Sequence, residues 1–204
     1  MIRPICLLLA SALLAWAPAH AGPTQAGAVD LARAGPVEPG APVMVDARIH
    51  TGPDGRLRST LRDGAQVTLG AEAAMVVRAF DYDPEAPGGA LGLDVGAGAF
   101  LFVGGRIEAA SGGRVEIHTP VGRLDVRGIA VWGGMIDGAY GVLVVNGDVV
   151  VTTAGGSITL AAGEATTIAR PEQAPVAEIW PNDKIDRAIQ TVTLDGDENR
   201  PNLQ

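Results

Sequence analysis

The fold class of this chain is decided by the stretch Tyr140-Gly141-Val142-Leu143-Val144-Val145-Asn146-Gly147-Asp148-Val149-Val150-Val151-Thr152-Thr153. An Asn-Gly pair between two apolar runs predicts a two-residue hairpin turn, because both residues tolerate a positive φ. The flanking runs are apolar at consecutive positions, so we expect this hairpin to be buried on both faces. The stretch therefore predicts the central hairpin of a β-protein.

Short strand-like runs separated by turns continue on both sides of this hairpin, from residue 43 to residue 169. Residues 56–61, for example, alternate apolar and polar side chains between two turns at 51–55 and 62–64. About ten such runs predict an all-β fold, either an irregular β-sandwich or an open barrel. A β-solenoid is the alternative, although no fixed repeat period favours it.

The first 42 residues do not follow this pattern. Residues 1–21 contain the parts of a secretory signal peptide: Arg3, an apolar run up to Trp16, and the motif Ala19-His20-Ala21, which predicts cleavage after Ala21. The apolar run is short for a membrane span, which makes a retained membrane anchor the weaker alternative. Residues 22–42 are rich in Gly, Ala and Pro and predict a flexible leader.

Residues 170–204 predict a linker, a C-terminal helix and an acidic, frayed tail. Ile185, Ala188, Ile189 and Val192 share one face at helical spacing. Either Asn182 or Asp183 is expected to cap the first turn of this helix. Its apolar face either packs on the β domain of residues 43–169 or binds a partner.

The charge and cysteine content of the chain exclude several functions. The formal net charge is −8, and this acidic balance argues against a nucleic-acid partner and against docking on anionic lipid. The only cysteine, Cys6, lies in the predicted signal peptide, so we expect neither a disulfide nor a thiolate metal site in the mature chain. We expect a periplasmic or secreted protein without a membrane span after signal cleavage.

No constellation of residues indicates catalysis. The sequence has no G-x-S-x-G elbow, and His50 and His118 each stand alone in a strand-like run. Asp81, Asp83 and Glu85 form an acidic cluster, but they lack the spacing of a calcium loop, so a solvated loop is the simpler interpretation. The carboxylates most relevant to an acid–base pair look like outward-facing strand positions: Glu108, Glu116 and Asp125. We therefore expect no enzymatic activity, no cofactor and no metal.

Several short motifs follow one another in a characteristic order. They are Thr51-Gly52 with Leu61, Asp63-Gly64, Val67 and Leu69-Gly70; Thr119-Pro120-Val121-Gly122 with Val126-Arg127-Gly128; the pattern V-x-V-x-x-G-x-V-x-V from Val142; and Leu160-Ala161-Ala162-Gly163-Glu164. In this order and spacing, residues 43–168 resemble the FecR domain family, the periplasmic all-β module of iron-uptake signalling proteins. The family usually continues R-G-T-x-F in the central motif, whereas this chain has Arg127-Gly128-Ile129-Ala130-Val131-Trp132, so both the Thr and the Phe are replaced.

The resemblance implies a non-catalytic module and supplies no catalytic residues. The best-known members carry a cytoplasmic anti-sigma segment and a membrane helix ahead of this domain. This chain has a predicted signal peptide in their place, so we expect that it does not itself pass a signal to a sigma factor.

The sequence also suggests roles for individual residues. Gly128, Gly147 and Gly163 are interpreted as structural glycines at turns or bulges. Arg127 lies in an apolar stretch, where it either pairs with Asp125 or Asp137, or reaches solvent or a ligand.

The leading hypothesis is an exported FecR-like domain that acts as a protein-interaction or sensing module in the cell envelope. The candidate interaction surface consists of Arg127, Trp132, Asp81 and Asp83, and the expected partner is an envelope protein. The alternative is a small-ligand or glycan-binding protein that uses the loop 81–90 and Trp132. An enzyme built on dispersed carboxylates is the third hypothesis, and a homodimer through an exposed edge strand is a further option.

Overall fold

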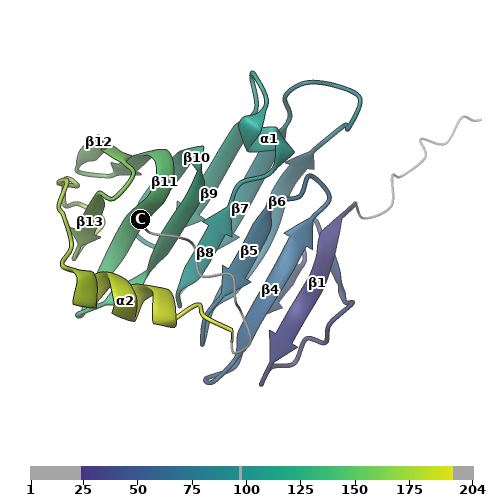
Figure 1. Ribbon diagram of the computed structural model, residues 1–204, viewed down its shortest axis with the longest axis horizontal. Coiled ribbons are helices and arrows are strands. Elements are labelled where there is room, and N and C mark those ends of the chain that lie inside the picture. The colour runs from purple at the N-terminus through teal and green to yellow at the C-terminus, as the bar shows by residue number, and fades with distance from the viewer. Residues whose placement is uncertain (1–23, 97, 195–204) are drawn as a thin grey trace, which may run out of the picture.

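Two long paired strands form the centre of the computed structural model, which describes residues 24–96 and 98–194 (Figure 1). β10 (Gly122–Ile136) is antiparallel to β11 (Ala139–Thr153) along its whole length. The chain reverses at Asp137-Gly138, where φ is +52° and +81°. Positive φ at both central residues is the geometry of a type I′ hairpin turn. The turn predicted at Asn146-Gly147 is therefore wrong, because both residues lie inside β11.

Asn146-Gly147 instead lies at a bend in this pair of strands. Arg127 pairs with Asp148, and Val131 pairs with Val144, but residues 128–130 and 145–147 between them leave the regular register. Gly147 has a φ of +88°, and a Cβ atom on it would lie 2.1 Å from the Cα atom of Gly128. The positive φ that favours a hairpin turn is also found in β-bulges. The close approach of the two backbones shows that Gly147 lies in a bulge and not in a turn.

The bend divides the partners of β10 into two groups. Its first half pairs with β9 (Arg114–Thr119), and its second half pairs with β8 (Phe100–Val103) on the same side. Beyond β8 follow β5 (Gln66–Leu69), β4 (Arg56–Leu61), β1 (Gln25–Arg33) and β2 (Pro42–Met44). Beyond β9 follow β7 (Ala90–Val95), β6 (Ala74–Asp81) and β3 (Arg48–His50). The other side of β11 pairs with β12 (Gly156–Ala161) and β13 (Ala165–Ile168).

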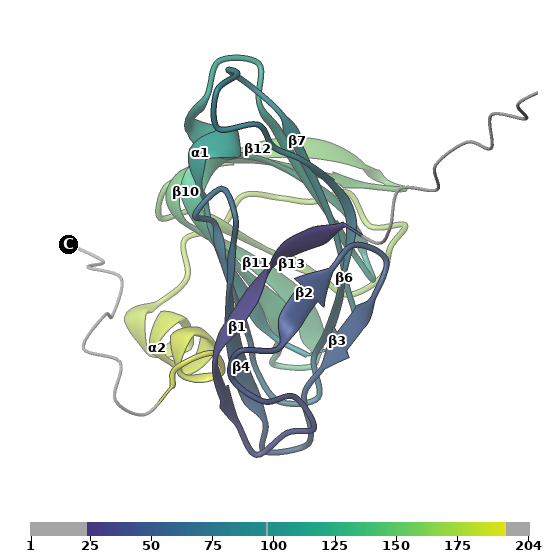
Figure 2. The same ribbon diagram turned by 90° about the vertical axis from the view of Figure 1, so that its right-hand side faces the viewer.

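The two ends of this sheet meet where β2 leads into β3. Val45 forms a bridge to Val77 of β6, and the Asp46 N–H donates to the Val77 carbonyl at 2.8 Å. The thirteen strands of the described residues therefore form one nearly closed, barrel-shaped sheet (Figure 2). The predicted all-β fold with one C-terminal helix is confirmed.

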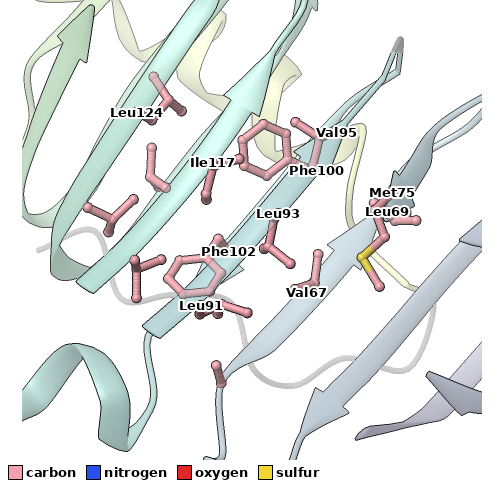
Figure 3. Packing of buried hydrophobic residues seen from close by; sticks show 14 of the residues in the cluster. Val67, Leu69, Met75, Leu91, Leu93, Val95, Phe100, Phe102, Ile117 and Leu124 are labelled. Atoms are coloured by element: carbon pink, nitrogen blue, oxygen red, sulfur yellow. The ribbon is translucent and has the colours of Figure 1, made fainter. Parts of the chain in front are cut away.

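The interior of the sheet is filled by apolar side chains that alternate with outward-facing polar ones. Figure 3 shows side chains from the two groups of strands packed against each other, with Phe100 and Phe102 beside Leu91, Leu93 and Ile117. All five are at most 2% exposed. Burial of a side chain of this size stabilises the fold by about 1.5–3 kcal/mol, so this core is the main source of stability.

The flexible leader predicted for residues 22–42 is wrong, because β1 is part of the sheet. β1 pairs with β2 on one side and β4 on the other, and Ala26 and Val29 are buried. The small residues that suggested a flexible chain have a packing role here. A Cβ atom on Gly27 would lie 2.3 Å from the carbonyl oxygen of Thr60 in β4, so only glycine fits at this point of the strand pair.

A short helix, α1 (Arg106–Ala109), was not predicted from the sequence. It is fixed by Asp63 in the β4–β5 turn, whose carboxylate accepts from the N–H groups of Ala65 at 3.1 Å and Ile107 at 3.4 Å. Asp63 is only 2% exposed. The motif Asp63-Gly64 is thus a turn that also anchors the first turn of α1.

The C-terminal helix, α2 (Asn182–Gln190), forms where the sequence predicts it. Its N-cap is Pro181 and no side chain caps it, so the expected cap by Asn182 or Asp183 is wrong. The helix packs on the outer face of β10 and β11 (Figure 1). There it joins a second apolar cluster: Ala99, Trp132, Ile136, Leu143, Ala165, Trp180, Ala188 and Val192.

The predicted signal peptide and the predicted acidic tail, residues 195–204, lie outside the described residues. Within the part of the chain that the structure describes, no helix is long and apolar enough to cross a membrane.

Because of the bend, we expect substitution of two glycines of similar φ to have very different costs in the free energy of unfolding. Gly147 and Gly163 have φ of +88° and +83°, but only Gly163 has open space around its Cβ position. We expect Gly163→Ala to cost about 1–2 kcal/mol for the left-handed backbone alone. Gly147→Ala adds a clash with Gly128 and should cost about 3–5 kcal/mol in total. Urea unfolding measures both values, and equal costs would contradict the role of the close approach.

Candidate interaction surface

Trp132 does not contribute to any exposed surface, so its assignment to an interaction surface is wrong. Its side chain is 0% exposed and lies beneath the C-terminal segment. The indole N–H donates to Thr191 Oγ1 at 3.1 Å, and the ring meets Trp180 edge to face, with ring centroids 6.0 Å apart. The sequence could not reveal this burial, because the covering residues lie about fifty positions later in the chain.

Arg127, Asp81 and Asp83 are exposed. Asp81 pairs with Ala90, and Ala90 pairs with Arg114, which places the start of the loop 81–90 at the same end of the sheet as Arg127. Asp83 has a local role, because its carboxylate accepts from the Glu85 N–H at 2.9 Å and so shapes the loop. The three residues share one end of the sheet without forming a common cluster.

The two carboxylates expected to pair with Arg127 have other partners. Asp125 lies 3.1 Å from Arg123, and Asp137 forms an ion pair with Arg187. Of the two alternatives for Arg127, the structure shows the exposed one, and Arg127 stands opposite Asp148 in the strand register.

The outer face of β6, β7, β9 and β10 carries a continuous row of charged side chains. Alternation directs these residues outward while their neighbours Leu93, Ile117 and Leu124 fill the core. We call this row the charge ladder, and it consists of Asp46, Arg78, Asp94, His118, Glu116, Arg123 and Asp125.

Consecutive members of the charge ladder are in contact. Arg78 lies 2.5 Å from Asp94, and His118 lies between Asp94 at 3.6 Å and Glu116 at 2.5 Å. Arg123 then joins Glu116 at 3.7 Å to Asp125 at 3.1 Å. His118 is thus held between two carboxylates, which is an ion-pair arrangement and not a nucleophile–base pair.

The charge ladder contributes little to stability but gives this face a distinct chemistry. Every member side chain is about a third or more exposed, and exposed ion pairs contribute about 0–1 kcal/mol each. Four carboxylates stand against two guanidinium groups and one imidazole, so the ladder carries a net negative charge. Such a face selects a partner by charge complementarity and steers its approach.

A different set of charges holds α2 on the opposite outer face. Arg187 donates to both carboxylate oxygens of Asp137, at 2.5 and 3.3 Å. Lys184 lies 3.8 Å from the same carboxylate and 4.2 Å from the ring centroid of Trp180. The hydrogen bond from Arg187 lowers the pKa of Asp137. We call Asp137, Trp180, Lys184 and Arg187 the C-terminal clasp.

Within residues 24–96 and 98–194, no group of three or more His, Cys, Asp or Glu side chains is arranged to hold a metal ion. The acidic cluster of the loop 81–90 lies within these residues.

Sequence reasoning identified Glu116 and Asp125 as outward-facing positions but did not connect them to one surface. The ladder brings together residues from strands that are neighbours in space and not in sequence. The signal available was the alternation itself, which leaves charged residues at every second position of 114–118 and 123–127.

Comparison with known proteins identifies the class to which this fold belongs. A family model described as FecR protein matches residues 47–150, just over half of the chain. The chain therefore belongs to the FecR protein family, and the resemblance seen in its motifs is confirmed. A search of curated protein sequences found no match.

The fold is also similar to solved structures. Two crystal structures of a candidate anti-sigma factor from Parabacteroides distasonis match with TM-scores of 0.57 and 0.56, at 19% and 18% sequence identity. Each match covers 71% of this chain, and 65% and 64% of the other chains. This chain thus spans just under two thirds of their length, and the similarity concerns the fold.

The clasp predicts a loss of stability in acid that depends on Asp137. Because its pKa is lowered in the folded protein, its contribution is complete above the ordinary value of 3.8 and is lost as pH falls through the lowered value. Asp137→Asn keeps a residue that tolerates the positive φ but does not titrate. We expect the decrease in urea midpoint between pH 7 and pH 3 to be smaller for Asp137→Asn than for the unchanged protein. Asp186→Asn, an exposed position on α2, is the control, and an equal effect of both variants would contradict the prediction.

Proposed function

We propose that this chain is an exported, non-catalytic FecR domain that acts as a protein-interaction or sensing module in the cell envelope. The observation that carries the proposal is its membership of the FecR protein family, with a match that spans most of the barrel-shaped sheet. The similarity to a candidate anti-sigma factor supports a regulatory role mediated by protein contacts.

The charge ladder is the surface that we assign to the partner. The outer face over β8, β10, β11 and β13 is already covered by α2 and the second apolar cluster. The outer face over β6, β7, β9 and β10 carries exposed charges from four strands. All ladder residues except Asp46 fall within the residues that match the family model. A partner with a basic or mixed-charge surface fits this face.

The small-ligand alternative relied on the loop 81–90 together with Trp132. Because Trp132 is buried beneath α2, its ring is not available to stack on a ligand. We therefore favour the protein-interaction function over the small-ligand function, because its candidate surface, the charge ladder, is exposed.

Export is part of the proposal and rests on the signal-like residues 1–21. When the full chain is expressed with a C-terminal tag in a Gram-negative host, we expect it in the periplasmic fraction with Gly22 as its first residue. Intact-mass and N-terminal sequence measurements check this. A tagged chain that keeps Met1 and stays in the cytoplasm would contradict export without touching the interaction surface.

The interaction is tested by affinity capture from solubilised envelope, with the tagged mature chain as bait and mass spectrometry to identify partners. We expect reproducible recovery of an envelope protein and at least a tenfold reduction with the variant Glu116→Lys/Asp125→Lys, since like charges oppose docking. The fold should persist, because exposed pairs add little stability. Thermal unfolding verifies this.

The matched control for that experiment is Glu172→Lys/Asp186→Lys, which makes the same change in charge at exposed positions away from the ladder. It should retain the partner. Equal loss with both variants would show a general charge effect and remove the ladder from the proposal. Recovery of no protein above the untagged control would count against the interaction function itself.

A further inference from the structure

The strand β12 has an open edge at the end of the sheet (Figure 1). Among the strands that the structure describes, β2, β3, β12 and β13 each pair with a single neighbouring strand. β2 and β3 have three residues each, and they contain Pro42 in the first and Arg48 and His50 in the second. β13 is covered, because Ala165 and Glu178 exchange two backbone hydrogen bonds. Proline, charges and cover keep a sheet edge from pairing with another chain, and β12, with six residues, has none of them.

Two residues of β12 present free backbone groups at this edge. Thr153 pairs with Gly156 across a two-residue turn, and from there the residues of β12 bond alternately toward β11 and away from it. Ile158 therefore bonds to β11, whereas Ser157 and Thr159 direct their N–H and C=O groups to the open side. Both residues are exposed, and within the described part of the chain no hydrogen bond reaches these outward groups.

The chain itself closes one end of the open edge. The next outward N–H, that of Ala161, donates to Glu164 Oε2 at 2.8 Å. The free stretch is therefore Ser157-Ile158-Thr159, which is symmetric about Ile158. The Ile158 side chain packs against the main core but is only half-buried, so the centre of the stretch carries apolar surface that is still in contact with water.

We propose that a second copy of this chain pairs with β12 in the antiparallel direction, which makes the protein a two-fold symmetric dimer. The symmetry of the free stretch selects this occupant, because a two-fold interface requires a surface that is complementary to itself. Ser157 then faces Thr159 of the second copy, and Thr159 faces its Ser157, so that each pair exchanges both hydrogen bonds. The two Ile158 side chains meet on the two-fold axis, at a pair of the kind in which side chains come closest.

The dimer has a consequence for the charge ladder. Asp125 pairs with Val150, and Val150 pairs with Thr159, so these residues form one row on the outer face. Pairing of two β12 strands joins both copies into one sheet, with the two Asp125 residues five strand spacings apart, or about 24 Å. This separation exceeds the screening length of about 8 Å at physiological salt, so the ladders repel each other little. The dimer forms whether or not the ladder takes a partner.

Sedimentation equilibrium of the purified chain, from about 1 µM to about 1 mM, tests this proposal. We expect a reversible dimer that forms toward the upper part of this range, because small interfaces bind weakly. Thr159→Pro should raise the dimer dissociation constant by about tenfold or more, because each copy loses an inter-chain N–H donor. The fold should persist, since this N–H does not bond to β11 and proline is tolerated at a free edge. Thermal unfolding verifies this.

Exchange of charge at the two-fold axis tests the register of the pairing. Ile158→Lys and Ile158→Glu each place like charges opposite each other, so we expect each variant alone to be monomeric. An equimolar mixture of the two should form a mixed dimer at least as tight as that of the unchanged protein. Ile129→Lys is the matched control, because Ile129 is an apolar residue outside β12 that is 55% exposed, and this variant should dimerise normally.

Three outcomes would overturn the proposal. The first is a monomer at every concentration, and the second is a dimer that Thr159→Pro leaves unchanged, since that dimer uses another surface. The third is a mixture of Ile158→Lys and Ile158→Glu that stays monomeric while both variants are folded. If the protein is monomeric and Thr159→Pro instead abolishes capture of an envelope protein, the edge takes a strand of that partner and not of a second copy.

Discussion

The close contact between Gly128 and Gly147 is the constraint on which the remaining structure depends. Their backbones approach so closely that a Cβ atom on either residue would overlap the other strand. At this approach β10 and β11 bend and their register shifts, and the bend allows β10 to pair with β9 in its first half and β8 in its second. Both groups of strands are therefore held by the same central pair, and a single apolar core forms between them.

The bend also gives the molecule two different outer faces. Over the half that pairs with β8, apolar residues such as Trp132 and Leu143 face outward and need a cover, which α2 provides. Over the half that pairs with β9, the outward residues are charged and remain exposed as the charge ladder. The proposed functions follow this division, because a covered face holds the C-terminal region while an exposed charged face is open to a partner.

The sequence predicted the fold class because alternation and glycine-containing turns depend on local backbone geometry. It misplaced the hairpin because a positive φ at Gly147 serves a bulge as well as a turn, and only the contact with Gly128 distinguishes them. It missed β1 because Gly27 signals flexibility unless the backbone of Thr60 is known to lie against it. The burial of Trp132 and the clustering of the charge ladder were not predicted for the same reason, because both depend on residues that are distant in the chain. The family was still predicted correctly, because its motifs are identified by residue type and spacing and do not require a correct topology.

The position of the central pair in the chain has a consequence for folding. Strands β1 to β9 lie before residue 120, yet β8 and β9 both pair with β10, which comes later. The parallel pairing of β7 with β9 likewise requires a long crossover through β8 and α1. Contacts of this separation form slowly, because loop closure must precede them. A nascent chain therefore lacks its central pair of strands until Thr153, about three quarters of its length, has been made.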